Sequence, residues 1–471
     1  MHETDFRSSL QTEGDRRRLK TIIALTIVYA ATIGLHLAPW SQWVLLGLFS
    51  IQALRLIFAP PRLAIALNTE LNGEELNNEQ VQELPFFSLL ASAKNEEAVI
   101  GNLVKALCQL DYPSDRLEVW IVDDNSSDRT SEVLELLKQK YPQLKTLRRE
   151  SGAQGGKSGA LNQVLALTKG DIIGVFDADA QVPVDVLRSL VPMFQSSKTS
   201  SNTPSNIGAV QLRKAIANAS ENWWTAGQSC EMALDLCLQD LRIRVGGTGE
   251  LRGNGQFVRR QALDDCGGWN EQTITDDLDL TLRLHLCQWD IACLNFPAVQ
   301  EEGVVSLKQL WHQRNRWAEG GFQRYLDYWD LLLSNRMGFL KTFDATLFYI
   351  NQYLLTIAFI PDTIAAIVLR HHPMLPPIAG FSLALSSVTM AFGLKRSYQM
   401  SWRSAIWQTI SGMIYMLHWI PVIISVTLRM CILPKRLKWV KTQHQGAGKN
   451  NNLLEEIELE NIELKEIESN A

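Results

Sequence analysis

The stretch LEVWIVDDNSSDRTSEVLELLKQ, Leu117–Gln139, decides the expected fold. Its first eight residues form a largely apolar run that ends in two aspartates, a pattern typical of a buried strand. The Ser-Asp sequence that follows can cap a helix, and the chain then continues with residues typical of a helix. A strand that leads directly into a helix is the repeating unit of a parallel α/β sheet.

Two further strands are expected on either side of this unit. FFSLLASA (Phe86–Ala93) predicts an earlier strand, and EEAVIGNLVKALCQL (Glu96–Leu110) predicts the helix after it. DIIGVFDADA (Asp171–Ala180) predicts a later strand that ends in acids. Strands that alternate with helices form parallel sheets with right-handed crossovers, which is an architecture that binds nucleotides. The sequence therefore predicts an α/β fold.

Apolar segments flank this α/β region. TIIALTIVYAATIGLHLAP (Thr21–Pro39) follows a basic stretch and is long enough to span a bilayer, and WVLLGLFSIQALRLIF (Trp43–Phe58) predicts a second, less regular span. A cleavable signal peptide is disfavoured because no small-residue cleavage site follows the first run. The basic residues before the first run predict a cytoplasmic N-terminus, which returns the chain to the cytoplasm near residue 60.

Three more apolar segments follow Lys341, so four regions are expected. These are N-terminal transmembrane helices (1–62), a cytoplasmic α/β domain (63–340), C-terminal transmembrane or interfacial helices (341–435) and a charged tail (436–471). Three crossings would export the basic sequence PKRLKWVK, against the positive-inside rule, so one segment is either interfacial or re-entrant. The tail is either an amphipathic helix or disordered.

Composition agrees with a soluble domain joined to a membrane part. The 471 residues are 46% hydrophobic and 20% charged, with 14 tryptophans. The net charge of −5 gives no reason to expect nucleic acid as a partner. The seven cysteines contain no CxxC pair and have no histidines at zinc-ligand spacing. We therefore expect reduced, structural thiols and no metal–thiolate site.

Three acidic clusters contain the candidate functional residues. Asp123 and Asp124 end the strand quoted above, Asp177 and Asp179 end the next strand, and Asp276 precedes Asp277 in TITDDLDLTLRL. Each pair alone is common in turns and helix caps. In open parallel sheets, however, ligands bind beyond the carboxyl ends of the strands. The three clusters together therefore predict a ligand site at that edge.

The residue types indicate what the site would bind. Asp177 and Asp179 point to the same side of an extended chain, and such carboxylates suit Mg²⁺ or Mn²⁺ held together with a diphosphate. GAQGGKSGALN (Gly152–Asn162) adds flexible backbone and the cation Lys157, but it has neither the GxxxxGK[ST] nor the GxGxxG frame. A further carboxylate free of metal could act as a general base; we favour Asp277, with Asp276 and Asp279 as alternatives.

Together these residues resemble the membrane-bound, inverting glycosyltransferases of family 2, the group that contains cellulose, hyaluronan and chitin synthases. Their pattern is D, DxD, [TE/D]D and QxxRW. Residues 86–320 show VDDNSSD, DADA, TDD and Gln313-x-x-Arg316-Trp317 in the same order. The third motif reads Thr-Asp-Asp rather than Thr-Glu-Asp, which keeps the charge. The resemblance implies a GT-A nucleotide-diphospho-sugar transferase domain with a mainly parallel sheet, flanked by transmembrane helices.

The resemblance also implies a role for each matching residue. Asp123 or Asp124, together with Asp177, would hold the uridine diphosphate of the donor, with Lys157 beside it. Asp177 and Asp179 would bind the metal, and Asp277 would be the catalytic base. The acceptor side would comprise Gly253, Asn254, Gly255 and Asp276, and the diphosphate would be covered by Gln313, Arg316 and Trp317.

The acceptor is inferred from the layout of the chain. Its size and helix order are similar to family members that transfer glucose from UDP-glucose to diacylglycerol at a membrane surface. The helix expected over Leu307–Trp329 would then place Trp311, Trp317, Phe322 and Tyr325 at the level of the lipid headgroups. Two alternatives remain: a processive β-glycan synthase that uses a UDP-sugar, and a catalytically inactive membrane scaffold.

Overall fold

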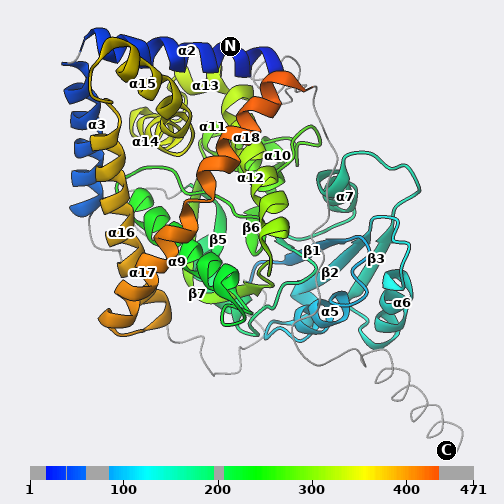
Figure 1. Cartoon of the computed structure of the whole chain (residues 1–471). Coiled ribbons are helices and arrows are strands. Elements are labelled where there is room, and N and C mark those ends of the chain that lie inside the picture. The colour runs from blue at the N-terminus through cyan, green and yellow to red at the C-terminus, as the bar shows by residue number, and fades with distance from the viewer. Residues whose placement is uncertain (1–16, 39, 60–83, 196–205, 434–471) are drawn as a thin grey trace, which may run out of the picture.

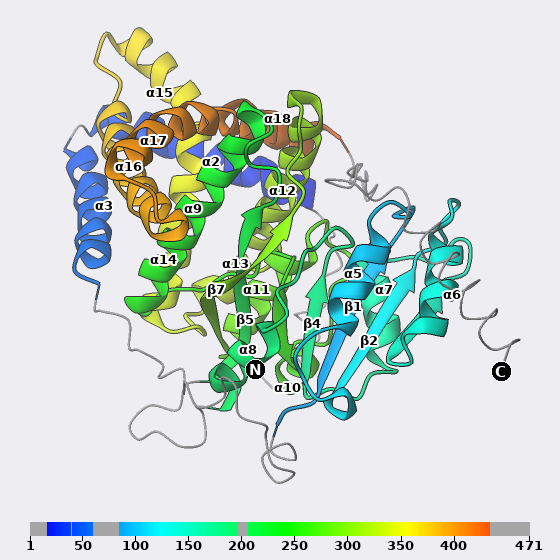
Figure 2. The same cartoon turned by 90° about the horizontal axis from the view of Figure 1, so that it is seen from below.

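The computed structural model describes residues 17–38, 40–59, 84–195 and 206–433. A seven-stranded sheet in the order β3-β2-β1-β4-β6-β5-β7 forms its centre (Figures 1 and 2). All strand pairs are parallel except those of β6, which is antiparallel to β4 and β5. The expected α/β fold with a mainly parallel sheet is confirmed. The strands are β1 (Phe87–Ala93), β2 (Leu117–Asp123), β3 (Leu144–Arg148), β4 (Ile172–Phe176), β5 (Ile207–Ile216), β6 (Gln256–Arg259) and β7 (Asp290–Glu301).

Helices cover both faces of the sheet, which explains why the central strands β1 and β4 are largely apolar and buried. Leu89 of β1 packs into one core cluster and its neighbour Leu90 into the other, because successive side chains point to opposite faces. One face is covered by α5 (Ile100–Cys108), α6 (Thr130–Lys140) and α8 (Val186–Gln195), and the other by α7 (Gly156–Leu165), α10 (Arg260–Asp265) and α11 (Asp276–Leu286). A short 3₁₀ turn, η2 (Ser114–Arg116), leads into β2.

Within the described residues, four helical stretches are long and apolar enough to cross a membrane: Arg17–Leu37, Phe339–Leu369, Pro376–Tyr398 and Trp402–Ile432. The first predicted run and the three that follow Lys341 are therefore apolar helices, whereas the second run forms a shorter one, Gln42–Ile57. The elements are α2 (Arg17–Leu37), α3 (Ser41–Ile57), α14 (Phe339–Tyr349), η3 (Ile350–Leu354), α15 (Leu355–Leu369), α16 (Pro376–Tyr398), α17 (Trp402–Met416) and α18 (Trp419–Ile432). The expected tail, 436–471, lies outside the described residues.

These apolar helices are not one parallel bundle. Figure 1 shows α2 running across the ends of α3 and α16 rather than alongside them. α2 packs against α15, α18 and α12, and its Arg17 forms a buried ion pair with Asp327, with Nε 2.8 Å from Oδ1. The number of crossings and the cytoplasmic side of the α/β domain remain predictions.

Two helices join the sheet to the apolar helices. α9 (Trp223–Arg244) packs against α16 and α17, and α12 (Leu307–Asp327) packs against α18 and α11, with α13 (Trp329–Leu333) following it. The placement of Phe322 and Tyr325 at lipid headgroups was wrong. Both are buried, and their rings pack on Tyr349 and Tyr353 because the helices from residue 339 onward cover this face of α12.

Candidate active site

A cavity of about 770 Å³ lies beyond the carboxyl ends of β1, β2 and β4. This is the edge at which open α/β sheets bind ligands, because the loops that follow the strands meet there. Three of the residues predicted for the site do not line this cavity: Asp123, Asn254 and Gly255. The cavity brings together the other ten, which are Asp124, Lys157, Asp177, Asp179, Gly253, Asp276, Asp277, Gln313, Arg316 and Trp317.

The two aspartates at the end of β2 have different surroundings. Asp123 is buried, and its carboxylate accepts hydrogen bonds from the Ser126 amide at 2.8 Å and the Ser131 hydroxyl at 2.5 Å, which fix the turn after the strand. Asp124 lines the cavity and forms an ion pair with Arg149 at 2.7 Å. Of the two alternatives, only Asp124 presents its carboxylate to a ligand in the cavity.

Lys157 connects two of the acidic clusters. It lies at the start of α7, with Nζ 2.6 Å from Asp177 Oδ1 and 3.9 Å from Asp276 Oδ2. Burial alone would lower the pKa of Lys157, but the charges of Asp177 and Asp276 outweigh it and raise that pKa. Burial would likewise raise the pKa of Asp177, yet the ammonium of Lys157 lowers it to about 2. Both groups are therefore charged at neutral pH.

Asp277 has the carboxylate best suited to accept a proton. Burial, and then the charge of Asp276, raise the pKa of Asp277 to about 6, which is near the pH at which a general base works well. A Cβ at Gly253, which has a φ of +81°, would lie 3.3 Å from Asp277 Oδ2, so glycine leaves this carboxylate accessible. The alternative Asp279 is buried outside the cavity, paired with Arg283 at 2.6 Å and Tyr328 at 2.9 Å.

Asn254 supports the site from behind. Its side chain is fully buried, and its Oδ1 accepts a hydrogen bond from the Asp177 amide at 3.3 Å. Nearby, Asp179 Oδ2 accepts a hydrogen bond from the Glu302 amide at 3.0 Å. These contacts fix the end of β4 and therefore the positions of the carboxylates at residues 177 and 179.

The two arginines of the QxxRW segment on α12 have different surroundings. Arg314 is fully buried, lies 2.5 Å from Glu231 of α9 and stacks over Trp317 with 3.9 Å between its guanidinium and the ring centroid. Arg316 lines the cavity, and among the described residues it forms no ion pair. Arg314 thus fixes α12 against α9, while Arg316 has a cation available for a ligand.

The carboxylates of the cavity could bind a metal ion only if a bound substrate supplied the remaining coordinating atoms. Across the described segments, no cluster of three or more His, Cys, Asp or Glu side chains could hold a metal ion alone. The cavity nevertheless has almost twice as many acidic as basic lining residues, and Asp276 Oδ2 is buried without a hydrogen-bond partner. Hard carboxylate oxygens of this kind suit Mg²⁺ that is shared with a diphosphate.

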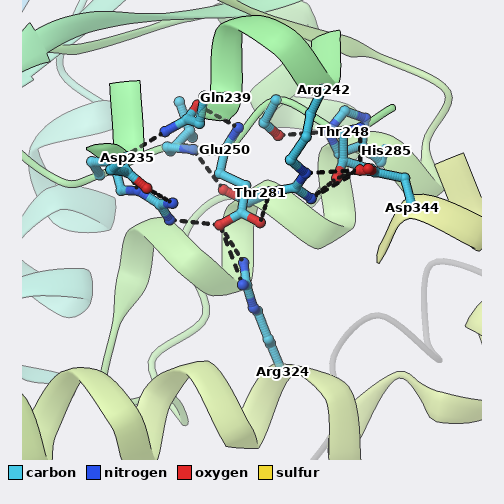
Figure 3. A network of polar contacts seen from close by, with 12 residues as sticks. Asp235, Gln239, Arg242, Thr248, Glu250, Thr281, His285, Arg324 and Asp344 are labelled. Atoms are coloured by element: carbon cyan, nitrogen blue, oxygen red, sulfur yellow. Dashed lines mark hydrogen bonds and ion pairs between the residues drawn. The ribbon is translucent and has the colours of Figure 1, made fainter. Parts of the chain in front are cut away.

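The sequence reasoning missed a network of buried charges beside the site (Figure 3). Glu250 accepts hydrogen bonds from Arg242 at 3.1 Å, Arg252 at 2.5 Å and Arg324 at 3.3 Å. Arg242 also contacts Asp344 of α14 at 3.0 Å, and Arg252 binds Asp235 of α9 through Nε, also at 3.0 Å. Burial would raise the pKa of Glu250, but these arginines hold it well below its usual value. Arg324 lies 74 residues from Glu250 and Asp344 lies 102 residues from Arg242, so no local spacing reveals the whole network.

The apolar helices form part of the wall of the cavity. Phe348 of α14, Thr356 of α15, and Ile420 and Ile423 of α18 all face the same cavity as the acidic clusters. Phe348, Thr356 and the two isoleucines belong to helical stretches long enough to cross a membrane. One cavity therefore joins a polar, nucleotide-type site to a site of membrane character.

The chain is similar to known proteins over most of its length. The model of the family described as "Glycosyltransferase like family 2" matches residues 85–320. Two beta-monoglucosyldiacylglycerol synthases are close in sequence. The one from Trichormus variabilis is 55% identical, over 93% of this chain and 92% of its own length, and the one from Synechocystis sp. is 52% identical, over 94% and 92%.

The solved structures are more distant. The mannosyltransferase PcManGT from Pyrobaculum calidifontis, solved in complex with GDP-Man and Mn²⁺, is 19% identical and covers 88% of this chain and 99% of its own. Its TM-score is 0.49, which is too low to support a conclusion about function.

Proposed function

The chain belongs to the glycosyltransferase-like family 2 and is a glycosyltransferase, and on that premise we propose that it transfers glucose from UDP-glucose to 1,2-diacylglycerol. The observation that carries the proposal is that one cavity is lined both by strand-end carboxylates and by side chains of the apolar helices. A cavity with both kinds of lining can admit a soluble nucleotide sugar together with a membrane lipid. The names of the close relatives support this reading.

The donor would occupy the end of the cavity formed by the sheet. Asp124 and Asp177 would contact the uridine and ribose side, and Lys157 would lie beside the diphosphate at the N-terminal end of α7, where backbone amides favour anions. Gln313, Arg316 and Trp317 would cover the diphosphate from α12. The guanidinium of Arg316, which forms no ion pair with any residue that the structure describes, suits a phosphate because it can donate two hydrogen bonds in parallel.

The metal that we propose is Mg²⁺, with Mn²⁺ as the substitute, held by Asp177 and Asp179. When bound, it would offset the negative charge of the departing diphosphate. Without a cation, a diphosphate would enter a cavity in which acids outnumber bases, which is electrostatically unfavourable.

Chelation is therefore expected to stop the reaction. Excess EDTA should lower glucosyl transfer by at least about 10²-fold, because the diphosphate loses its counter-charge, and added Mg²⁺ should restore the rate. Replacing Asp179 with alanine should raise the Mg²⁺ concentration needed for half-maximal rate. Full activity in excess EDTA, after removal of endogenous metal, would contradict the metal site.

The acceptor would enter from the end of the cavity formed by the apolar helices. Two arginines of the cavity wall, Arg252 and Arg324, are already paired with Asp235 and Glu250, so neither is available to a lipid phosphate. A charge-balanced wall of this kind suits an uncharged lipid. Diacylglycerol, which has only a hydroxyl and two esters at its polar end, meets this requirement.

In the proposed reaction, Asp277 takes the proton from the acceptor hydroxyl as that oxygen attacks C1 of glucose. The bond from C1 to the diphosphate breaks on the opposite face, and UDP leaves with the bonding electrons. An α-linked donor then gives a β-glucoside, and Asp277 later releases its proton to water. Gly253 and Asp276 would lie on the acceptor side of this step, with Asn254 and Gly255 supporting them.

We further propose a multi-pass membrane protein with its catalytic domain on the cytoplasmic side. The four apolar stretches support this topology, since each is long enough to cross a bilayer. A cytoplasmic domain would have direct access to soluble UDP-glucose.

The identity of the product tests the proposal. Purified protein supplied with UDP-glucose, diacylglycerol and Mg²⁺ should form a lipid-soluble monoglucoside that a β-glucosidase cleaves. An insoluble glucan without glycolipid would show a processive synthase instead, and no transfer to any acceptor would favour an inactive scaffold. UDP-galactose and UDP-N-acetylglucosamine, supplied in parallel, test the choice of sugar.

A further inference from the structure

An ion pair between Lys214 and Glu301 lies in the wall of the cavity, and neither residue is among the site residues identified above. Lys214 Nζ is 2.8 Å from Glu301 Oε2, and the two side chains are 8% and 12% exposed. They are diagonal neighbours on one face of the sheet, because Lys214 of β5 pairs with Val299 of β7 and side chains alternate along a strand. Removing such a pair from water costs free energy, so the pairing alone adds little stability. The other contacts of the pair indicate what it does.

The pair holds the loop on both sides of Gly253. Lys214 Nζ donates a hydrogen bond to the Arg252 carbonyl at 3.2 Å. Glu301 Oε2 accepts a hydrogen bond from the Asn254 side chain at 3.5 Å. Gly253 lies between these two contacts, and a Cβ there would lie 3.3 Å from the carboxylate of the proposed base. The ion pair therefore fixes the stretch of backbone that lies against the base.

The same lysine contacts the tryptophan of the QxxRW segment. Lys214 Nζ lies 5.5 Å from the centroid of the Trp317 ring, and the Arg314 guanidinium lies 3.9 Å from the same centroid. Cations within about 6 Å of an indole are attracted to its ring. Arg314 is fixed in turn by Glu231, and Lys214 is fixed by Glu301. The indole is thus held by two cations, each of which has a carboxylate of its own.

We propose that Lys214 is a positioning residue for the transfer step, and that it acts by holding Gly253 and Trp317 in place around Asp277. This inference rests on the proposed function. The ammonium of Lys214 is already bonded to a carboxylate and a carbonyl, which suits a positioning role better than a contact with the diphosphate. The carboxylates of the donor site are held by other cations, so the loss of Lys214 should affect the transfer step more than donor binding.

The charge of Lys214 also acts on the proposed base. Burial is the largest influence on Asp277 and raises its pKa, whereas the charge of Lys214 lowers that pKa. The charged groups that act on this carboxylate come from four elements: Asp276 on α11, Lys157 on α7, Lys214 on β5 and Arg316 on α12. Loss of the lysine charge should raise the pKa of Asp277 and move the acidic limb of the rate profile to higher pH. A residue that only stabilises the fold would leave this limb in place.

The test replaces Lys214 with methionine, which has a similar length but no charge. In Lys214→Met, kcat should fall about tenfold and the acidic limb should move to higher pH. The KM for UDP-glucose and the affinity for UDP, measured by titration calorimetry, should stay as in the wild type. Lys214→Arg keeps the charge, so it should keep the wild-type acidic limb and recover most of kcat.

Another lysine of the sheet provides a matched control. Lys145 of β3 lies 2.7 Å from Glu118 and 5.1 Å from the centroid of the Trp120 ring, so it makes the same kinds of contact. It does not line the cavity, and its side chain is more exposed than that of Lys214. Lys145→Met should therefore retain the wild-type kcat and pH profile.

A double variant separates positioning from a loss of stability. Lys214→Met leaves Glu301 without its cation, which destabilises a buried site. Adding Glu301→Gln removes both charges, so the double variant should melt close to the wild type while its kcat stays low. The inference would be overturned by a wild-type kcat or an unmoved acidic limb in Lys214→Met, by recovery of kcat in the double variant, or by UDP affinity that falls as much as kcat. Wild-type protein that makes no glucolipid would instead overturn the proposed function.

Discussion

Replacing Asp277 with asparagine is expected to lower turnover by about 10³-fold while UDP-glucose binds as in the wild type. Asparagine has nearly the same shape as aspartate but cannot take a proton from the acceptor hydroxyl. The fold should tolerate the change, because it removes one of two like charges that are buried side by side. Steady-state rates together with calorimetric binding of UDP-glucose would measure the two effects separately.

The pH dependence of the rate identifies the same carboxylate. A base with a pKa of about 6 is protonated as the pH falls, so kcat/KM should drop about tenfold for each pH unit below 6. Burial is the main cause of this raised pKa, and the charge of Asp276 is the second. Asp276→Asn should therefore move the acidic limb of the profile to lower pH without abolishing activity.

An exposed aspartate supplies the control for this experiment. Asp264 of α10 is exposed and does not line the cavity, so Asp264→Asn should retain the wild-type rate and pH profile. Asp279→Asn is unsuitable as a control, because it would disturb a buried pair with Arg283. An Asp277→Asn variant with undiminished turnover would exclude Asp277 as the base.

Replacing Arg316 with alanine is expected to lower kcat/KM by about 10²-fold. Its guanidinium forms no ion pair among the described residues and lines the cavity, so we expect it to stabilise charge on the leaving diphosphate. The fold should be unaffected, since no buried carboxylate loses its partner. Affinity for UDP, measured by titration calorimetry, should fall with the rate.

Variants of two other arginines serve as controls for this prediction. Arg403→Ala, at an exposed position of α17, should retain activity, and Arg316→Lys should recover part of it because lysine keeps the charge but not the paired hydrogen bonds. Arg314→Ala should instead destabilise the protein, because it leaves Glu231 without its closest cation in a buried site. Unchanged UDP affinity in Arg316→Ala would show that this cation does not contact the diphosphate.

Much of the fold could be predicted because its signals are local. Leu117–Asp123 is an apolar run that ends in acids and leads into a helix, and Ile172–Phe176 is a second apolar run before acids, so the type of sheet followed from general rules, whereas the order of its seven strands did not. The apolar helices were equally visible, because a long, mainly apolar segment is recognised from its own residues without tertiary context. The candidate residues Asp124, Asp177 and Asp277 were found because each follows or begins a regular element.

The sequence by itself determined the parallel sheet, the apolar helices and the residue types of the donor site, since period, length and motif order are properties of short segments. Only the tertiary structure showed that Asp124 rather than Asp123 faces the cavity, and that Arg314 is paired with Glu231 while Arg316 forms no ion pair among the described residues. Burial and the pairing of charges depend on segments up to hundreds of residues apart, as in the ion pair between Arg17 and Asp327. The solvent exposure of a side chain is set by what packs on it, and no local pattern specifies that.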